Sequence, residues 1–252
     1  MPPLLVLKFG GTALGTPARI RRAARRLAAH RRAGADLVAV VSAPGHTTDR
    51  VLRTLTQVTR VDSTIPTRET DRALATGEEL SAALVAAALE SLGHPARSFR
   101  GGEAGLGASG PFGAGRLVHF DPAPLRRCLD AGVIPVVAGF QAIGADQETR
   151  TLGRGASDLT AVYLAARLGA AECHIVTDVD GVYDADPRLS ANARRHTQLS
   201  HAALVSLAES GAEIVHAGAA HEALVSRVPL QVYGYTEPLR HRAGTLIQEE
   251  VA

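Results

Sequence analysis

The stretch that decides the fold lies near the start of the chain and reads Leu5-Val6-Leu7-Lys8-Phe9-Gly10-Gly11-Thr12. Residues 4–9 predict a strand, and the glycine pair after it is a place where backbone can approach a phosphate closely. Lys8 is the only lysine among twenty-six arginines, which suggests that arginine does not serve at this position. An ammonium is a compact point charge, whereas guanidinium is a wide planar fork. The stretch therefore predicts a phosphate-binding corner, with chance survival of one lysine codon as the simpler alternative.

Strand and helix signals alternate along the rest of the chain. Further strands are predicted at 36–42, 133–138, 173–177, 230–233 and 245–247, and helices at 17–33, 48–60, 68–92, 122–132, 157–169, 200–211 and 217–226. The glycine-rich residues 101–115 predict a loop and hairpin. This alternation predicts an α/β three-layer sandwich with a mainly parallel central sheet flanked by helices. We expect a single domain over residues 1–252, with lobes at about 1–148 and 149–252.

Composition narrows the class of protein further. Hydrophobic residues make up 46% of the chain and charged residues 21%, and no run reaches the roughly 18 apolar residues of a membrane span. No secretion signal is recognised at the start, and Cys128 and Cys173 suggest neither a disulfide framework nor a zinc site. We therefore expect a cytoplasmic protein without a membrane partner. The net charge of +2 argues against a nucleic-acid partner, and the seven arginines within 19–32 are read as a solvated helix face.

Two segments offer polar groups at a strand end or on a helix, where open α/β sheets bind ligands. Residues 40–49 read V-V-S-A-P-G-H-T-T-D. Their hydroxyls and a following helix N-terminus make an anion site, with helix capping by the threonines as an equal alternative. In the second segment, Glu78 follows Gly77 within an apolar helix. It could face a ligand ammonium, although a solvent-exposed glutamate is the simpler interpretation.

Two later segments carry further candidates. In residues 151–158, Arg154 lies between two glycines and can clamp a carboxylate through two parallel hydrogen bonds. Helix capping explains Ser157 and Asp158, but it does not explain Arg154. Residues 177–188 contain several acids after a buried strand, yet they lack the later glutamate of an EF-hand, which argues against a calcium loop. A loop at the edge of a nucleotide, with Tyr183 as a flat contact, fits this segment better. No cluster of metal-ligating residues is recognised.

Together the segments resemble the aspartate kinase branch of the amino acid kinase family. The motifs K-F-G-G-T, V-V-S-A-x-G-x-T-T-D, T-L-G-R-G-x-S-D and T-D-V-D-G-V-Y-x-A-D-P-R occur in that order across essentially the whole chain. The resemblance implies the amino acid kinase fold, ATP and Mg²⁺ as cofactors, and phosphorylation of the β-carboxylate of L-aspartate to 4-phospho-L-aspartate. It further implies an amino-acid-binding first lobe, a nucleotide-binding second lobe and a homodimer. The alternatives are a kinase for another small amino acid carboxylate, or a catalytically weak ligand-binding subunit.

The resemblance also assigns roles. Lys8 and Asp158 would be catalytic, with Lys8, Gly10 and Gly11 at the phosphates. The substrate would be bound by Ser42, Thr48, Glu78, Arg154, Ser157 and Asp158, with Arg154 on the α-carboxylate and Glu78 and Asp158 on the α-ammonium. The nucleotide would contact Thr177, Asp178, Tyr183 and Arg188. A substrate carboxylate has a pKa of about 4 and is already ionised near neutrality, so the reaction needs positioning and positive charge rather than a general base.

The chain departs from the family pattern at a few places. Ala13 stands where the family usually has serine after K-F-G-G-T, and Ala156 replaces the second glycine of R-G-G-S-D. Glu213 stands where a lysine close to the nucleotide is usual, so the sign of that charge is reversed. The sequence also stops where the ACT regulatory domains of aspartate kinases would begin, which predicts an activity without feedback control.

Overall fold

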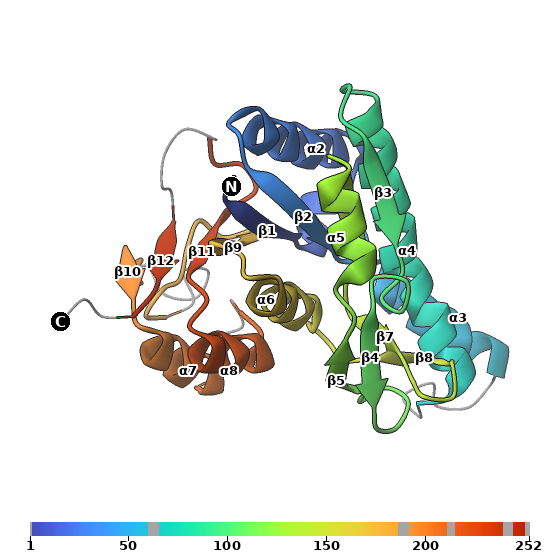
Figure 1. The fold of residues 1–252 in the computed structure, drawn as a ribbon. Helices are drawn as coiled ribbons and strands as arrows, with labels where there is room; N and C mark the ends of the chain where they lie inside the picture. The colour runs from blue at the N-terminus through green and yellow to red at the C-terminus, as the bar shows by residue number, and fades with distance from the viewer. Residues whose placement is uncertain (1, 60–65, 186–191, 211–214, 239–243, 250–252) are drawn as a thin grey trace.

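A mainly parallel sheet of eight strands, covered by helices on both faces, forms the centre of the molecule (Figure 1). The computed structural model describes residues 2–59, 66–185, 192–210, 215–238 and 244–249. In spatial order the strands are β10 (Gln198–Leu199), β12 (Thr245–Ile247), β11 (Leu230–Gly234), β9 (Glu172–Thr177), β1 (Leu4–Phe9), β2 (Asp36–Val41), β6 (Ile134–Ala138) and β3 (Ala96–Phe99). The β11–β12 pair is antiparallel, and the other pairs of this sheet are parallel. The predicted three-layer α/β sandwich is thus confirmed.

Strand β1 lies in the middle of this sheet and pairs with β2 on one side and with β9 on the other. The strands beyond β2 precede residue 140, and the strands beyond β9 follow residue 170. The strand order therefore reverses at β1. In open α/β sheets, ligands bind at the carboxyl ends of the strands beside such a reversal. Lys8 lies at this end of β1.

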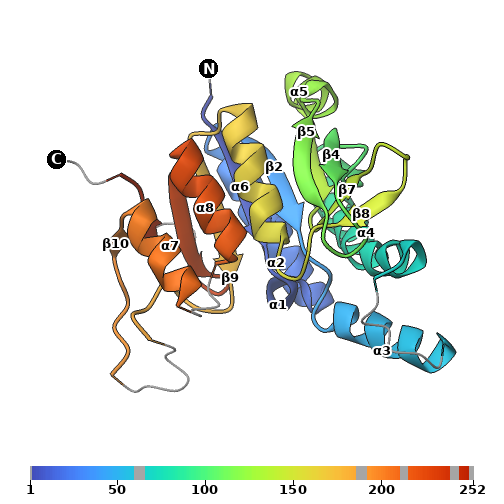
Figure 2. The same ribbon diagram turned by 90° about the horizontal axis from the view of Figure 1, so that it is seen from below.

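The alternation of side chains along the strands sorts the core into two layers. Helices α2 (Pro17–Arg32) and α4 (Arg68–Glu90) pack on one face, where Leu7 and Phe9 belong to their hydrophobic cluster. On the other face, Val6 packs with residues of α5 (Ala123–Asp130), α6 (Ser157–Leu168), α7 (His201–Glu209) and α8 (Ala217–Ser226). Figure 2 shows α6 and α8 on this side of the sheet. Because Lys8 has the parity of Val6, its side chain points toward the layer of α6.

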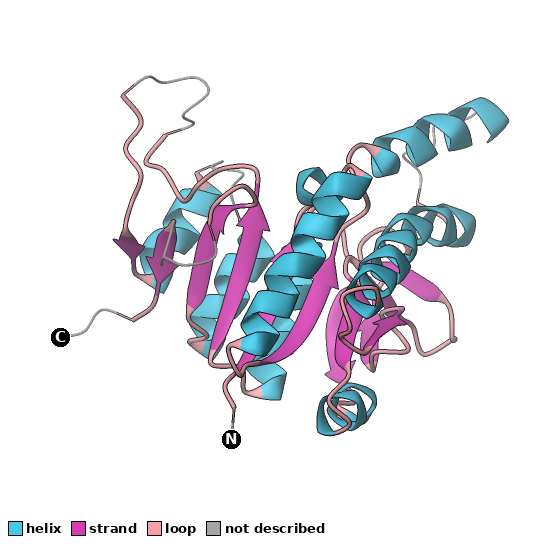
Figure 3. Cartoon of the chain, turned by 90° about the horizontal axis from the view of Figure 1, so that it is seen from above, coloured by secondary structure: helices cyan, strands magenta, loops and turns pink. Residues whose placement is uncertain are grey.

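A second sheet lies beside the first and joins strands β5 (Arg116–Phe120), β4 (Leu106–Ser109), β7 (Gln141–Ile143) and β8 (Thr149–Thr151). The β4–β5 hairpin confirms the prediction for residues 101–115. Helix α1 (Gly11–Leu14) follows β1 directly, and α3 (Thr47–Thr59) extends away from the body of the protein (Figures 2 and 3). The β7–β8 hairpin crosses residue 148, so the expected division into lobes at that residue falls inside a hairpin.

The helix signals in the sequence correspond to real helices. Thr16 accepts a hydrogen bond from the amide of Arg19 and caps α2, as the sequence predicts. Helix α4 is a single helix that continues through Gly77. Strands β3, β7, β8 and β10 were not predicted, because they are short and lack a continuous apolar run.

Candidate active site

A cavity of about 440 Å³ opens at the carboxyl ends of the central strands. Six residues that the sequence analysis singled out line it, namely Gly11, Ser42, Thr48, Glu78, Arg154 and Ser157. They come from α1, the segment after β2, α3, α4, the segment between β8 and α6, and the first residue of α6. The structure thus brings together five of the six predicted substrate-binding residues, and only Asp158 is missing from the wall.

Two close backbone approaches shape this cavity around Ala43. A Cβ atom on Gly11 would lie 2.7 Å from the Ala43 carbonyl oxygen, and a Cβ atom on Gly77 would lie 2.7 Å from the Ala43 Cβ. Both distances are shorter than real Cβ contacts, so only glycine fits at either position. The segment after β2 is therefore held between the segment after β1 and helix α4. This contact places Ala43 beside Glu78.

Glu78 is buried, with 4% of its surface exposed. Its Oε1 accepts a hydrogen bond of 2.9 Å from the Ala43 amide, whereas its Oε2 has no hydrogen-bond partner within the described residues. Burial raises the pKa of this carboxyl group from 4.5 to about 7, because a charge is costly away from water. An acid with one free oxygen in a cavity wall is suited to a cationic ligand group, which would stabilise its ionised form.

Arg154 lies at the opening of the cavity, with 80% of its side chain exposed. Its Nη2 is 2.9 Å from Oδ1 of Asp49, which lies in the first turn of α3. An exposed ion pair of this kind is weak, so a ligand carboxylate can displace Asp49. The guanidinium is therefore available to an anionic ligand group on the same cavity that contains Glu78.

Lys8 and Asp158 form a buried ion pair in which Lys8 Nζ lies 2.7 Å from Asp158 Oδ1. The other carboxylate oxygen accepts a hydrogen bond of 3.2 Å from the His216 amide. Both oxygens of Asp158 are thus engaged, and the residue does not line the cavity although its neighbour Ser157 does. This geometry fits a residue that holds the Lys8 ammonium in place better than a ligand for a substrate ammonium.

The two glycines beside Lys8, Gly10 and Gly11, differ in the hydrogen bonding of their amides. The Gly10 amide donates a 3.0 Å hydrogen bond to the Val176 carbonyl, so in this structure it is not free to bind a phosphate as the sequence analysis expected. Gly11 begins α1, and the first amides of a helix have no acceptor in the helix. A Cβ atom on Gly10 would lie 3.4 Å from Lys8 Nζ. The missing side chain therefore leaves room beside the ammonium.

The residues expected at the nucleotide begin with Thr177, the last residue of β9, the strand next to β1. The Thr177 hydroxyl donates to Asp178 at 3.1 Å, and the Tyr183 hydroxyl donates to Asp180 at 2.6 Å. That hydrogen bond is the main cause of a raised pKa for Tyr183. These residues lie apart from the cavity wall, on the side of β1 opposite to β2. The expected nucleotide contact Arg188 and the departure Glu213 lie outside the described residues.

The sequence analysis missed several residues of the cavity wall, among them Thr70, Asp71 and Phe140. Asp71 is fully buried and accepts hydrogen bonds from the Gly113 amide, the Thr151 amide and the Thr151 hydroxyl at 2.8–3.0 Å. It thereby joins α4 to the β4–β5 hairpin loop and to β8. Its position seven residues before Glu78 was a usable signal, because residues two helical turns apart share a face.

Phe140 has a backbone φ of 67°, an unusual value for a bulky residue. The Thr160 hydroxyl accepts a 3.1 Å hydrogen bond from the Phe140 amide and thereby stabilises this conformation.

Ala13, a departure from the family pattern, is buried in the cluster beneath α2. Among the described residues, no helix is long and apolar enough to cross a membrane. The same residues contain no group of three or more His, Cys, Asp or Glu side chains that could hold a metal ion.

The fold and this site define a member of a kinase family. The sequence profile of the amino acid kinase family matches residues 3–233, and the chain belongs to that family. Among curated proteins, the chain is 42% identical to the aspartokinase of Geobacillus stearothermophilus over 249 residues, which cover 99% of this chain and 60% of that protein. It is 46% identical to the aspartokinase of Corynebacterium efficiens over 232 residues, covering 91% of this chain and 54% of that protein. The resemblance to aspartokinases is thus confirmed, and the chain spans somewhat more than half the length of these relatives.

Solved structures agree with this assignment. The aspartate kinase from Synechocystis superposes with a TM-score of 0.84 at 35% identity, covering 99% of this chain and 40% of that chain. E. coli aspartokinase III in complex with aspartate and ADP gives a TM-score of 0.83, covering 99% of this chain and 65% of that chain. At 24% identity, that second likeness supports the fold alone.

Proposed function

We propose that this chain transfers the γ-phosphoryl group of ATP to the β-carboxylate of L-aspartate. The observation that carries the proposal is the cavity that Glu78, Arg154 and the hydroxyl residues Ser42, Thr48 and Ser157 line together. Aspartate carries one ammonium and two carboxylates, and the wall offers a complementary group for each. The relatives named aspartokinase, at 42% and 46% identity, support the choice of substrate.

In this proposal each cavity residue binds one part of aspartate. Glu78 Oε2, which has no partner among the described groups, accepts hydrogen bonds from the α-ammonium. Arg154 releases Asp49 and binds the α-carboxylate. The hydroxyls of Ser42, Thr48 and Ser157, which also line the cavity, orient the β-carboxylate. The substrate is then fixed at both ends, so that one carboxylate oxygen points toward the phosphoryl donor.

The reaction itself forms a bond between a β-carboxylate oxygen and the γ-phosphorus, while the bond from that phosphorus to the bridging oxygen breaks and ADP leaves. Charge on the transferring group is the main obstacle, and a positioned cation lowers the barrier. Lys8 supplies this cation. Asp158 acts as a positioning residue, because its contacts to Lys8 and to the His216 amide fix the ammonium.

ATP and magnesium belong to the same proposal. The residues after β9 lie at the strand end beside Lys8, where Thr177, Asp178 and Tyr183 suit the edge of a nucleotide. Magnesium in kinases usually keeps several waters and is bound by substrate phosphates together with one or two carboxylates. Asp158 is already engaged by Lys8 and a backbone amide, so we assign no protein ligand to this ion. The first lobe would then bind the amino acid and the second the nucleotide, with β1 between them.

The proposed homodimer rests on a separate observation. Leu80 and Leu84 are exposed on α4, one turn apart, with 51% and 41% of their surfaces accessible. Homodimer interfaces are more apolar than the rest of a protein surface, so this exposed apolar pair is a candidate contact. Sedimentation of the wild-type chain and of Leu84→Glu tests this point. A monomeric wild type would refute it.

The function is tested by ADP release and hydroxamate trapping with each of the twenty amino acids. We expect turnover with L-aspartate and little with amino acids that lack a β-carboxylate. Arg154→Ala should raise KM for aspartate much more than KM for ATP, whereas Arg25→Ala, an exposed arginine on α2, should change neither. A preference for another amino acid would redirect the substrate assignment. Binding without any turnover would favour a ligand-binding subunit instead.

A further inference from the structure

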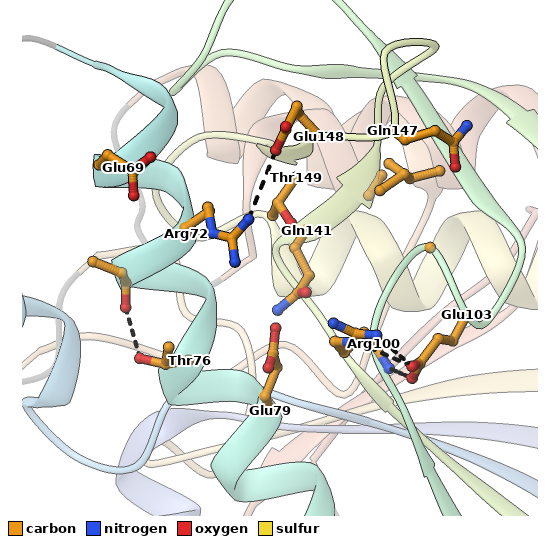
Figure 4. A pocket seen from close by; sticks show the side chains of 14 residues that line it. Glu69, Arg72, Thr76, Glu79, Arg100, Glu103, Gln141, Gln147, Glu148 and Thr149 are labelled. Carbon is orange, nitrogen blue, oxygen red and sulfur yellow. Dashed lines mark hydrogen bonds and ion pairs between the residues drawn. The ribbon is translucent and has the colours of Figure 1, made fainter.

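A second and larger cavity, of about 660 Å³, lies on a neighbouring face of α4 and is separate from the candidate active site. Figure 4 shows that three segments form it, namely α4, the turn at residues 100–103 and the β7–β8 hairpin. Its polar wall includes Glu69, Arg72, Thr76, Glu79, Arg100, Glu103, Gln141, Gln147, Glu148 and Thr149. The proposed kinase reaction uses none of these residues.

Helix α4 separates the two cavities. Residues 70, 71, 74 and 78 line the candidate active site, whereas residues 69, 72, 73, 76 and 79 line the second cavity. Both sets have helical spacing and therefore form two adjoining stripes on one helix. Phe140 and Gln141, which are consecutive, likewise belong to different cavities. A ligand in the second cavity would thus contact the elements that form the wall of the first.

Most of the charges in the second cavity are neutralised by their neighbours. Arg100 donates to Glu103 through two nitrogen atoms, at 2.7 and 3.0 Å. Glu148 lies 2.9 Å from Nε of Arg68, and Glu69 also contacts Arg68. These three acids therefore have cationic partners and do not need a ligand.

Two charged groups remain without a close partner. Arg72 has only a contact of 3.9 Å to Glu148, and within the described residues Glu79 makes no hydrogen bond or ion pair that would neutralise it. Burial is the main cause of a raised pKa for Glu79, and the positive charges of Arg100 and Arg72 oppose it without contacting the carboxylate. Figure 4 shows Glu79 and Gln141 pointing toward one another, below Arg72. Arg72 and Glu79 are seven residues apart on one helix, which separates their Cα atoms by about 10.5 Å.

We propose that this cavity binds a small zwitterion whose ammonium contacts Glu79 and whose carboxylate contacts Arg72. Two helical turns between the Cα atoms of Arg72 and Glu79 leave room for a ligand whose two charges are several bonds apart. Gln141, whose Nε2 donates to the Ala75 carbonyl at 3.0 Å, lies between them as a polar part of the wall. Binding at this place does not depend on the kinase reaction.

The proposal is tested by calorimetry of the full chain with 6-aminohexanoate, and with hexylamine and hexanoate as ligands that each carry one of the two charges. We expect 6-aminohexanoate to bind at least tenfold more tightly than either of the other two. Arg72→Gln and Glu79→Gln should each weaken this binding at least tenfold. Arg154→Ala, in the other cavity, and Glu90→Gln, an exposed acid at the end of α4, should leave it unchanged.

Three results would overturn the proposal. One is the absence of binding by 6-aminohexanoate, and another is equal binding of hexylamine or hexanoate. The third is loss of binding in Arg154→Ala rather than in Arg72→Gln, which would place the ligand in the candidate active site. If Glu79→Gln fails to fold, Arg72→Gln decides the matter, because more than half of the Arg72 side chain is exposed.

Discussion

Replacing Glu78 with glutamine is expected to stabilise the ligand-free protein at alkaline pH while it damages substrate binding. The folded protein raises the pKa of Glu78 from 4.5 to about 7. The folded state therefore holds its proton over a range in which the unfolded chain has lost it. Stability contributed by the protonated group is complete below pH 4.5 and is lost as the pH rises to about 7.

The size of this loss follows from the pKa. A difference between 4.5 and about 7 corresponds to about 3 kcal/mol at 1.36 kcal/mol per tenfold change in acidity. Glutamine carries no charge, and its Oε1 can still accept the hydrogen bond from the Ala43 amide. For a domain of this size, about 3 kcal/mol shifts Tm by roughly 10 °C. The Tm values of Glu78→Gln and wild type should thus be similar at pH 4.5, whereas at pH 8 the Tm of the variant should be higher by roughly 10 °C.

Thermal unfolding of both proteins across pH 4.5 to 8.5, without ligand, measures this effect. Glu90→Gln is the matched control, because Glu90 is exposed on the same helix. The same Glu78 variant should raise KM for aspartate more than tenfold, since it cannot form a charge-assisted hydrogen bond with the ammonium. A variant whose advantage in Tm is equal at every pH would refute the reasoning about the ionised carboxylate.

Three more changes test the site. Lys8→Arg should lower kcat by roughly a hundredfold, because a wide planar guanidinium would replace the compact ammonium in the buried pair with Asp158, and near-normal turnover would contradict this. Asp49→Asn should lower KM for aspartate by up to about fivefold without changing KM for ATP, since it frees Arg154 from an exposed ion pair worth about 1 kcal/mol or less; an unchanged KM for aspartate would count against the displacement. Asp71→Asn should lower Tm by about 5 °C and raise KM for aspartate. The substitution leaves a buried backbone amide that now donates to Asp71 without an acceptor, at a cost of about 1–3 kcal/mol. Thermal unfolding and steady-state kinetics check both effects.

Much of the fold could be predicted from local sequence patterns. The apolar runs at residues 4–9 and 133–138 predicted central strands, and the caps and apolar stripe of α2 predicted its ends. Short strands such as β7 and β8 escaped prediction, because three residues carry no measurable periodicity. Their place in a sheet depends on pairing between Gln141 and Thr151, which are ten residues apart.

Helix capping alone accounts for many polar residues at helix starts. A residue of the candidate site was therefore predictable where its motif could not be explained by capping. Arg154 between glycines is such a case and lines the cavity. The simpler interpretation of Glu78 as a solvent-exposed glutamate was wrong, because its side chain is buried in the cavity wall. Asp71 was missed, because an acid in the first turn of a helix is ordinary. Its function depends on Gly113 and Thr151, which are 42 and 80 residues away. The engagement of Asp158 by Lys8 and the His216 amide also depends on distant parts of the chain.

The central place of β1 has a consequence for how the protein is made. During synthesis on the ribosome, β1 can pair with β2 early. Its other edge remains unpaired until β9 has been made, more than 160 residues later in the chain. Until then, an apolar strand with open hydrogen-bonding groups is a surface on which nascent chains can associate. Slow synthesis between residues 42 and 172 is therefore expected to increase aggregation. Faster translation of residues 42–172, or a chaperone that covers the unpaired edge of β1, should increase the yield of soluble protein.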